Sequence, residues 1–180
     1  TKDEVDNLFR LLETKSLRPD YNTSLRAFLF ACYTGLRIGD LLSITYENFH
    51  KLEYAGQTWT MLQFIQNKTK NQVKIPLIDK AYQIYMEFPS AGKKVFNNYS
   101  QKKLNEDLKE IIKIAKIQKP ISFSSSRCSC ATILADEGCP DHIIAAILGH
   151  KSVNTTRKYY IKTSDESLIK AMEKHYEKKQ

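Results

Sequence analysis

Hydrophobic residues in the first part of the chain recur at the spacing of helices. Thr1 and Glu4 match a capping box, and the apolar residues that follow repeat at steps of three and four. This pattern predicts a helix over 2–14. A second apolar run, from Leu25 to Tyr33, is long enough for a largely buried helix that ends at Thr34-Gly35.

The middle of the chain changes to the pattern of strands. A short helix is expected over 38–43, followed by a first strand candidate at 43–46. Residues 59–65 and 72–77 are rich in β-branched and aromatic residues, and they flank the polar turn 67–71. This arrangement predicts an antiparallel hairpin.

After the hairpin the apolar residues return to helical spacing. We therefore expect an α+β fold, in which a mainly helical domain carries a small three-stranded antiparallel sheet. No repeat or linker divides the sequence, so residues 1–180 are predicted to form a single domain. The helices expected after the hairpin cover 79–87, 100–117, 124–137, 140–148, 152–160 and 164–178.

Composition excludes several classes of protein. The chain has 180 residues, of which 42% are hydrophobic and 27% charged, and these proportions are typical of a globular domain rather than a disordered one. No apolar run reaches the roughly 18 residues of a membrane span, and the first residues lack the apolar stretch of a signal peptide. We expect a cytoplasmic protein whose four cysteines stay as thiols.

Positive charge is concentrated in one part of the sequence. The net charge is +8, residues 1–65 are close to neutral, and residues 66–119 hold twelve lysines against five acidic residues. A basic region of this kind favours a polyanionic partner, of which nucleic acid is the commonest. The alternative is a solvated, lysine-rich face.

Four short segments, in this order, resemble the catalytic domain of the tyrosine recombinase (phage integrase) family. The resemblance extends from about residue 1 to about residue 165, and in that family a helical DNA-clamping domain usually precedes the catalytic domain. We expect this chain to lack that clamp. The segments are Thr34–Leu42, the hairpin Lys68–Leu77, Phe123–Arg127, and Leu148-Gly149-His150 with Tyr159 nine positions after the histidine.

The resemblance implies a site-specific recombinase that cleaves and rejoins duplex DNA through a 3′-phosphotyrosyl intermediate. A tyrosine oxygen keeps the energy of the phosphodiester in a covalent ester, so neither a metal, a nucleotide nor any other cofactor is expected. Tyr159 takes the role of nucleophile by its interval from His150, with the adjacent Tyr160 as the alternative. Arg37 and Arg127 would hold the charged phosphorane, to which guanidinium groups are well matched.

The resemblance also assigns the remaining catalytic roles. Lys68, at the hairpin tip, would protonate the leaving 5′ oxygen, although Lys70 lies on the same hairpin. His150 would hydrogen-bond a phosphate oxygen or handle the proton of the nucleophile, and Asp40 would brace the arginine or its helix.

Each of these residues also has a plainer interpretation. Arg37 at a helix end is placed to pair with Asp40. Arg127 in a serine-rich turn is a possible surface charge, and Gly149-His150 is a possible helix C-cap with its histidine satisfied by backbone.

Ser124 departs from the family pattern, which has histidine three residues before the second arginine. A hydroxyl hydrogen-bonds a phosphate oxygen but does not exchange protons near neutral pH as imidazole does. The first alternative function is therefore a catalytically impaired DNA-binding module of the same fold. A type IB topoisomerase, which shares the chemistry, is the second.

Partners follow from the same resemblance. Other recombinase protomers are expected, as a tetramer on DNA, and a free monomer is compatible with the sequence. The expected helix 164–178 would dock on a neighbouring protomer, or else on its own domain.

No metal site is expected, because Cys128 and Cys130 point to opposite sides of a helix. The side chains expected to contact DNA are Lys70, Lys74, Lys102, Lys103, Lys151 and Arg157.

Overall fold

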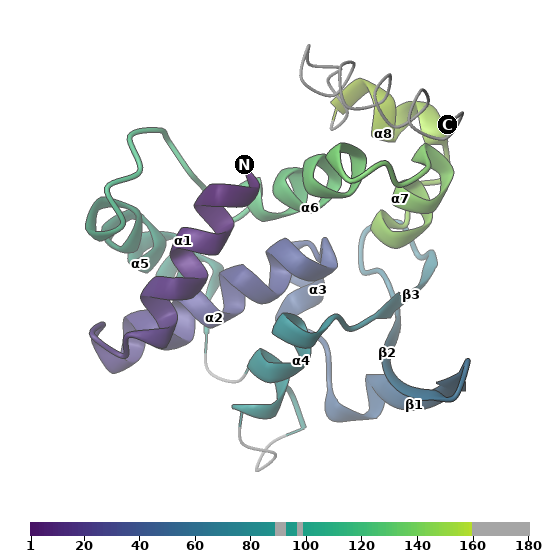
Figure 1. The fold of residues 1–180 in the computed structure, drawn as a ribbon, viewed down its shortest axis with the longest axis horizontal. Helices are drawn as coiled ribbons and strands as arrows, with labels where there is room; N and C mark the ends of the chain where they lie inside the picture. Colours follow the sequence, from purple (N-terminus) through teal and green to yellow (C-terminus); the bar gives the residue numbers. More distant parts are fainter. Residues whose placement is uncertain (89–92, 97–98, 160–180) are drawn as a thin grey trace, which may run out of the picture.

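A buried helix, α2 (Pro19–Thr34), lies at the centre of the computed structural model, which describes residues 1–88, 93–96 and 99–159 (Figure 1). The predicted burial of this helix is confirmed, because most of its residues are inaccessible to solvent. Four helices pack against α2: α1 (Lys2–Glu13), α4 (Asp79–Met86), α5 (Gln101–Ile114) and α6 (Ser125–Asp136).

The capping box predicted at the start of α1 is confirmed. The Thr1 hydroxyl accepts a hydrogen bond from the backbone N–H of Glu4, and the Glu4 carboxylate accepts one from the terminal amine of Thr1. The helix then buries Val5, Leu8 and Leu12 against the core. Local capping and helical periodicity therefore agree, which is why this element is readable from sequence.

Three antiparallel strands form the sheet, in the order β1 (Phe49–Tyr54), β2 (Gln57–Ile65) and β3 (Gln72–Pro76). Leu62 pairs with Ile75, and the same face of the sheet is buried at both positions. The predicted hairpin and the α+β fold are thus confirmed. Figure 1 shows the loop between β2 and β3 reaching toward α7 (Asp141–Leu148), which contacts β3.

The first strand candidate, 43–46, is wrong. Thr45 makes only an isolated bridge to Lys94, and a short 3₁₀ helix, η1 (Tyr46–Asn48), precedes the true first strand, β1. All of β1 after Phe49 is exposed, so this edge strand lacks the apolar alternation that marks a half-buried strand. Phe49 alone anchors it to the helices, by stacking on Tyr85 with the ring centroids 4.2 Å apart.

The remaining helices follow the predicted order. A single turn, α3 (Ile38–Leu41), comes after α2, and α7 is followed by α8 (Val153–Tyr159). The predicted helix 164–178 lies outside the described residues. In the part of the chain that is described, no helix is both long and apolar enough to cross a membrane.

Candidate active site

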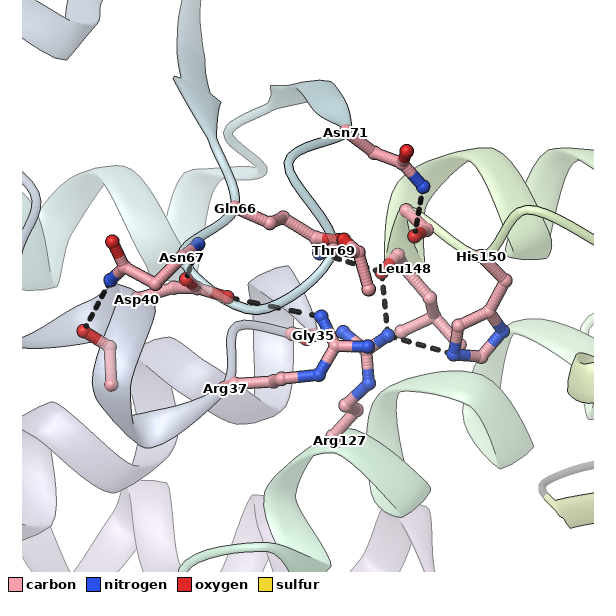
Figure 2. A network of polar contacts seen from close by, with 12 residues as sticks. Gly35, Arg37, Asp40, Gln66, Asn67, Thr69, Asn71, Arg127, Leu148 and His150 are labelled. Carbon is pink, nitrogen blue, oxygen red and sulfur yellow. Dashed lines mark hydrogen bonds and ion pairs between the residues drawn. The ribbon is translucent and has the colours of Figure 1, made fainter.

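Arg127 is the most buried basic side chain among the predicted site residues, with an exposed fraction of 4%. It extends from α6, and its guanidinium donates from Nη1 to the carbonyl of Gly35 at 2.6 Å and from Nη2 to that of Leu148 at 2.5 Å (Figure 2). These carbonyls belong to the C-terminal ends of α2 and α7, where the helix dipoles are negative and favour a cation. Arg127 is therefore not a surface charge.

Two glycines in the left-handed conformation form these helix ends. Gly35 has φ +68° and Gly149 has φ +66°, values that residues with a side chain rarely adopt. A Cβ at Gly35 would lie 2.6 Å from Cδ2 of Leu148, and one at Gly149 would lie 2.5 Å from Oε1 of Gln66. Each glycine therefore provides both the turn and the space that the site requires.

His150 follows Gly149 and joins Arg127 to α8. Its Nε2 lies 2.8 Å from Nη2 of Arg127, and its Nδ1 lies 2.7 Å from the hydroxyl of Thr156, a fully buried residue. A guanidinium only donates, so Nε2 accepts, and Nδ1 carries the proton that it donates to Thr156. The histidine is thus held by side chains, and not merely by backbone.

Burial, reinforced by the positive charges of Arg127 and Arg37, lowers the pKa of His150 to about 4. The ring is consequently neutral near pH 7. Figure 2 shows the guanidinium of Arg37 beside that of Arg127, which contacts His150, so the three side chains form one cluster.

Arg37 stands immediately before α3 and is less enclosed than Arg127. Its Nη1 lies 3.9 Å from Oδ2 of the buried Asp40, and neither atom has a hydrogen-bond partner among the described residues. The pairing with Asp40 is therefore present but loose. The side chain of Arg37 is 27% exposed, so part of it is open to an anionic ligand.

The loop between β2 and β3 lies across this cluster (Figure 2). The Asn67 N–H donates to Oδ1 of Asp40 at 2.8 Å, and the Gln66 side chain donates to the Leu148 carbonyl at 2.9 Å. Lys68, between these anchors and Thr69, is exposed, as are Lys70 and Lys74. Asp40 thus braces the loop as well as facing Arg37.

Ser124 and Tyr159 lie at the ends of two helices of the site. Ser124 is the exposed N-cap residue of α6, and its hydroxyl lies 2.7 Å from that of Ser122. Tyr159 is the last residue of α8. Tyr160 lies outside the described residues, so the choice between the two tyrosines stays a prediction.

Several of the basic residues expected to contact DNA are paired with carboxylates. Lys103 bonds to the buried Asp107 at 2.6 Å, and Arg157 bonds to Asp141 at 2.5 Å. Lys102 lies 3.9 Å from Glu106, and Lys151 is exposed. Lys103 therefore has a structural role in addition to its charge.

Metal ligands do not cluster anywhere in the described ranges, which contain no group of three or more His, Cys, Asp or Glu residues placed to hold an ion. On α6, Cys128 is exposed and Cys130 is buried, as their helical spacing predicts.

Gln66 and Thr156 are parts of the site that the sequence analysis missed. Both are almost completely buried polar residues that bond to predicted site elements. Each has a weak sequence signal: Thr156 lies in the interval between His150 and Tyr159, and Gln66 continues the alternation of buried Leu62 and Phe64.

Comparison with known proteins gives a consistent result. The sequence model described as the phage integrase family matches residues 1–166. Tyrosine recombinase XerC of Rickettsia canadensis is 28% identical over 159 residues, an alignment that covers 82% of this chain and 49% of the relative. Tyrosine recombinase XerD of Oceanobacillus iheyensis is 27% identical over 179 residues, covering 88% and 56%. The chain spans about half the length of these relatives.

Solved structures show the same fold at lower identity. The XerA recombinase has a TM-score of 0.74 at 19% identity, and the match covers 97% of this chain and 64% of that chain. The XerH site-specific recombinase bound to its difH substrate in a pre-cleavage complex gives 0.73 at 18%, covering 94% and 52%. A dimer of lambda integrase bound to a COC′ core site gives 0.66 at 19%, covering 92% and 59%.

Proposed function

This chain belongs to the phage integrase family, and we propose that it is the catalytic domain of a site-specific recombinase, which cleaves and rejoins duplex DNA through a 3′-phosphotyrosyl intermediate. The observation that carries the proposal is the convergence of Arg37, Arg127 and His150 from three separate segments of the chain. Two cations, one of them held by the neutral imidazole of His150, suit a phosphate whose negative charge increases in the transition state.

The two arginines differ in what they contribute. Arg127 is preorganised by two helix ends, so it costs little reorganisation when charge develops on a phosphate oxygen. Arg37 is partly exposed and only loosely paired with Asp40, which supports direct contact with the substrate. Asp40 would limit the movement of Arg37 without neutralising it at close range.

Nucleophile and acid complete the reaction. Tyr159 would attack the phosphorus as its phenolic proton passes to solvent water, and the bond to the 5′ oxygen of DNA would break. The Lys68 ammonium would give a proton to that oxygen. The reverse attack by a 5′ hydroxyl would release Tyr159 and reseal a strand, so the cycle needs no metal or nucleotide.

Duplex DNA and further protomers are the partners of this proposed activity. The XerH relative is seen bound to its difH substrate, and lambda integrase as a dimer on a core site. Lys70, Lys74 and Lys151 are exposed and would contact the DNA backbone. The predicted helix 164–178 would dock on a neighbouring protomer within a tetramer. The protein would act in the cytoplasm, with its four thiols reduced.

A denaturing gel after incubation with a nicked duplex tests the proposal. The duplex sequence is one that the protein itself selects from a random library, and the buffer contains EDTA. A covalent protein–DNA adduct is expected; Tyr159→Phe should abolish it, whereas Tyr160→Phe should still form it. DNA mapped to Tyr160, or to no tyrosine, would overturn the assignment, and an adduct that appears only with magnesium would indicate a metal-dependent enzyme.

A further inference from the structure

Gln66 connects the β2–β3 loop to the end of α7, and it does so from a buried position. Its exposed fraction is 1%, and its Nε2 donates to the Leu148 carbonyl at 2.9 Å. That same carbonyl accepts from Arg127. On the other side of the amide, Oε1 accepts from the Thr69 hydroxyl at 2.5 Å.

The backbone of Gln66 also closes the loop. Its N–H donates to the Asn71 carbonyl at 2.9 Å, and its own carbonyl accepts from the Lys70 N–H at 3.0 Å. Asn71 reinforces the attachment by donating from its side chain to the Gly149 carbonyl at 3.0 Å. Because Gly149 has no Cβ, the Gln66 side chain fits directly against it.

A second attachment is made by Asn67, the residue immediately before Lys68. Besides the bond from its N–H to Asp40, Asn67 donates from its side chain to the Gly39 carbonyl at 3.2 Å and to the Ser43 hydroxyl at 3.0 Å. Lys68 therefore has a tethered neighbour on each side, Asn67 and Thr69, while its own side chain is exposed.

We infer that Gln66 is a positioning residue, which holds the loop so that Lys68 reaches the leaving 5′ oxygen. This inference rests on the proposed function. Buried hydrogen-bonded groups have one preferred arrangement, so they fix the path of the backbone between them. A displacement of about 1 Å at a reacting group is enough to lower a rate by about 10²-fold.

The plainer interpretation is that Gln66 only supports Arg127 through the shared Leu148 carbonyl. The two roles differ in chemistry. If Gln66 positions the acid, its loss affects only leaving groups that need a proton. If it supports Arg127, its loss affects every leaving group, because phosphorane charge develops in all cases.

Gln66→Met is the appropriate variant, because methionine keeps the length and volume of glutamine but forms neither hydrogen bond. Gln57→Met is the matched control at the exposed, opposite end of β2. Thermal unfolding confirms that both variants are folded. Gln66→Glu, which keeps the acceptor for Thr69 and loses the donor to Leu148, serves as a second variant.

The first measurement needs no DNA. Hydrogen exchange of the Asn67 and Lys70 amides, followed by NMR, should be about tenfold faster in Gln66→Met. This is the size expected when both side-chain hydrogen bonds of Gln66 are lost. It should not change in Gln57→Met. Unchanged exchange in the Gln66 variants would show that Gln66 does not hold the loop, whatever the chain does to DNA.

The second measurement uses the nicked duplex in two forms, one with the natural 5′ oxygen at the cleaved bond and one with a 5′-bridging sulfur, which leaves as a thiolate without needing a proton. Gln66→Met should form adduct about 10²-fold more slowly than the parent on the oxygen duplex and within a few fold of it on the sulfur duplex. Lys68→Ala should show the same pattern, and Arg37→Ala should be slow on both.

An equal loss on both duplexes, or no loss on either, would overturn the positioning role of Gln66. A parent protein that forms adduct with neither duplex would instead overturn the proposed function, and this inference with it.

Discussion

Replacing Arg127 and Arg37 by alanine, one at a time, separates structural from catalytic contributions at the site. Arg127 is enclosed and hydrogen-bonded to two backbone carbonyls and to His150. Arg37 is partly exposed, and its ion pair with Asp40 is 3.9 Å long. Both guanidiniums are expected to act on the same phosphate, so the variants should resemble each other in activity and differ in stability.

The magnitudes follow from these contacts. A hydrogen bond to a charged donor contributes about 1.5–3 kcal/mol, and Arg127→Ala removes the donor from the carbonyls of Gly35 and Leu148. Relief from the cost of burying the charge offsets part of this loss, which leaves a destabilisation of about 3 kcal/mol. In a chain of this size that lowers Tm by about 6–12 °C. Arg37→Ala should cost less, about 1 kcal/mol, because its pair with the buried Asp40 is 3.9 Å long and the Asp40 carboxylate keeps its hydrogen bond from the Asn67 N–H.

Calorimetry and the rate of adduct formation, the latter measured below both transitions, provide the test. Each variant should form adduct about 10²–10³-fold more slowly than the parent. Equal Tm values for the two variants would refute the structural role given to Arg127. A variant that cleaves at the parental rate would remove that arginine from the catalytic site.

Three further predictions concern charge and protonation. Affinity for duplex DNA should fall steeply from about 50 to about 200 mM salt, and Lys70→Ala or Lys74→Ala should each lower the salt slope by about 1; a flat dependence in a filter-binding assay would contradict DNA recognition. Ser124→His should accelerate adduct formation, and no change or a loss would show that the site has adapted to the hydroxyl. An NMR titration should give His150 a pKa of about 4, and Arg127→Ala should raise this pKa because it removes a nearby cation. In the unfolded chain His150 takes up a proton near pH 6.5. The free energy of unfolding should therefore decrease as the pH falls from about 6.5 to 4.

The hairpin and the helices could be predicted because their local patterns agree with their burial. In β3, Val73 and Ile75 alternate with exposed residues, and both face the core. The first strand has no such pattern, since only Phe49 of its six residues is not exposed. Ile44 is apolar and fully buried, so the segment around it resembled a strand although it leads into a 3₁₀ turn.

The arginine and histidine cluster could be predicted only through motifs, because its members lie far apart in the sequence. Gln66 lies two residues after the buried Phe64, so the alternation of β2 places it on the inward face, but its polar side chain does not by itself indicate burial. Its burial depends on where α7 ends, which is a property of the tertiary structure. Thr156 is a similar case. Its position fits the helical pattern of its segment, but its contact with His150 depends on the turn at Gly149, which brings the histidine back toward α8.

The Leu148 carbonyl connects the two halves of the proposed chemistry. It accepts from Arg127, which would stabilise charge on the phosphate, and from Gln66, which would hold the loop that carries Lys68, the proposed proton donor. Because Gly149 ends α7 there in a left-handed turn, the carbonyl stays available to both donors rather than to a further turn of helix. Movement of the end of α7 would therefore displace the arginine and the lysine loop together. In this arrangement one structural element would set both the proposed charge-stabilising group and the proposed proton donor, and a substitution that shifts this turn should impair both functions at once.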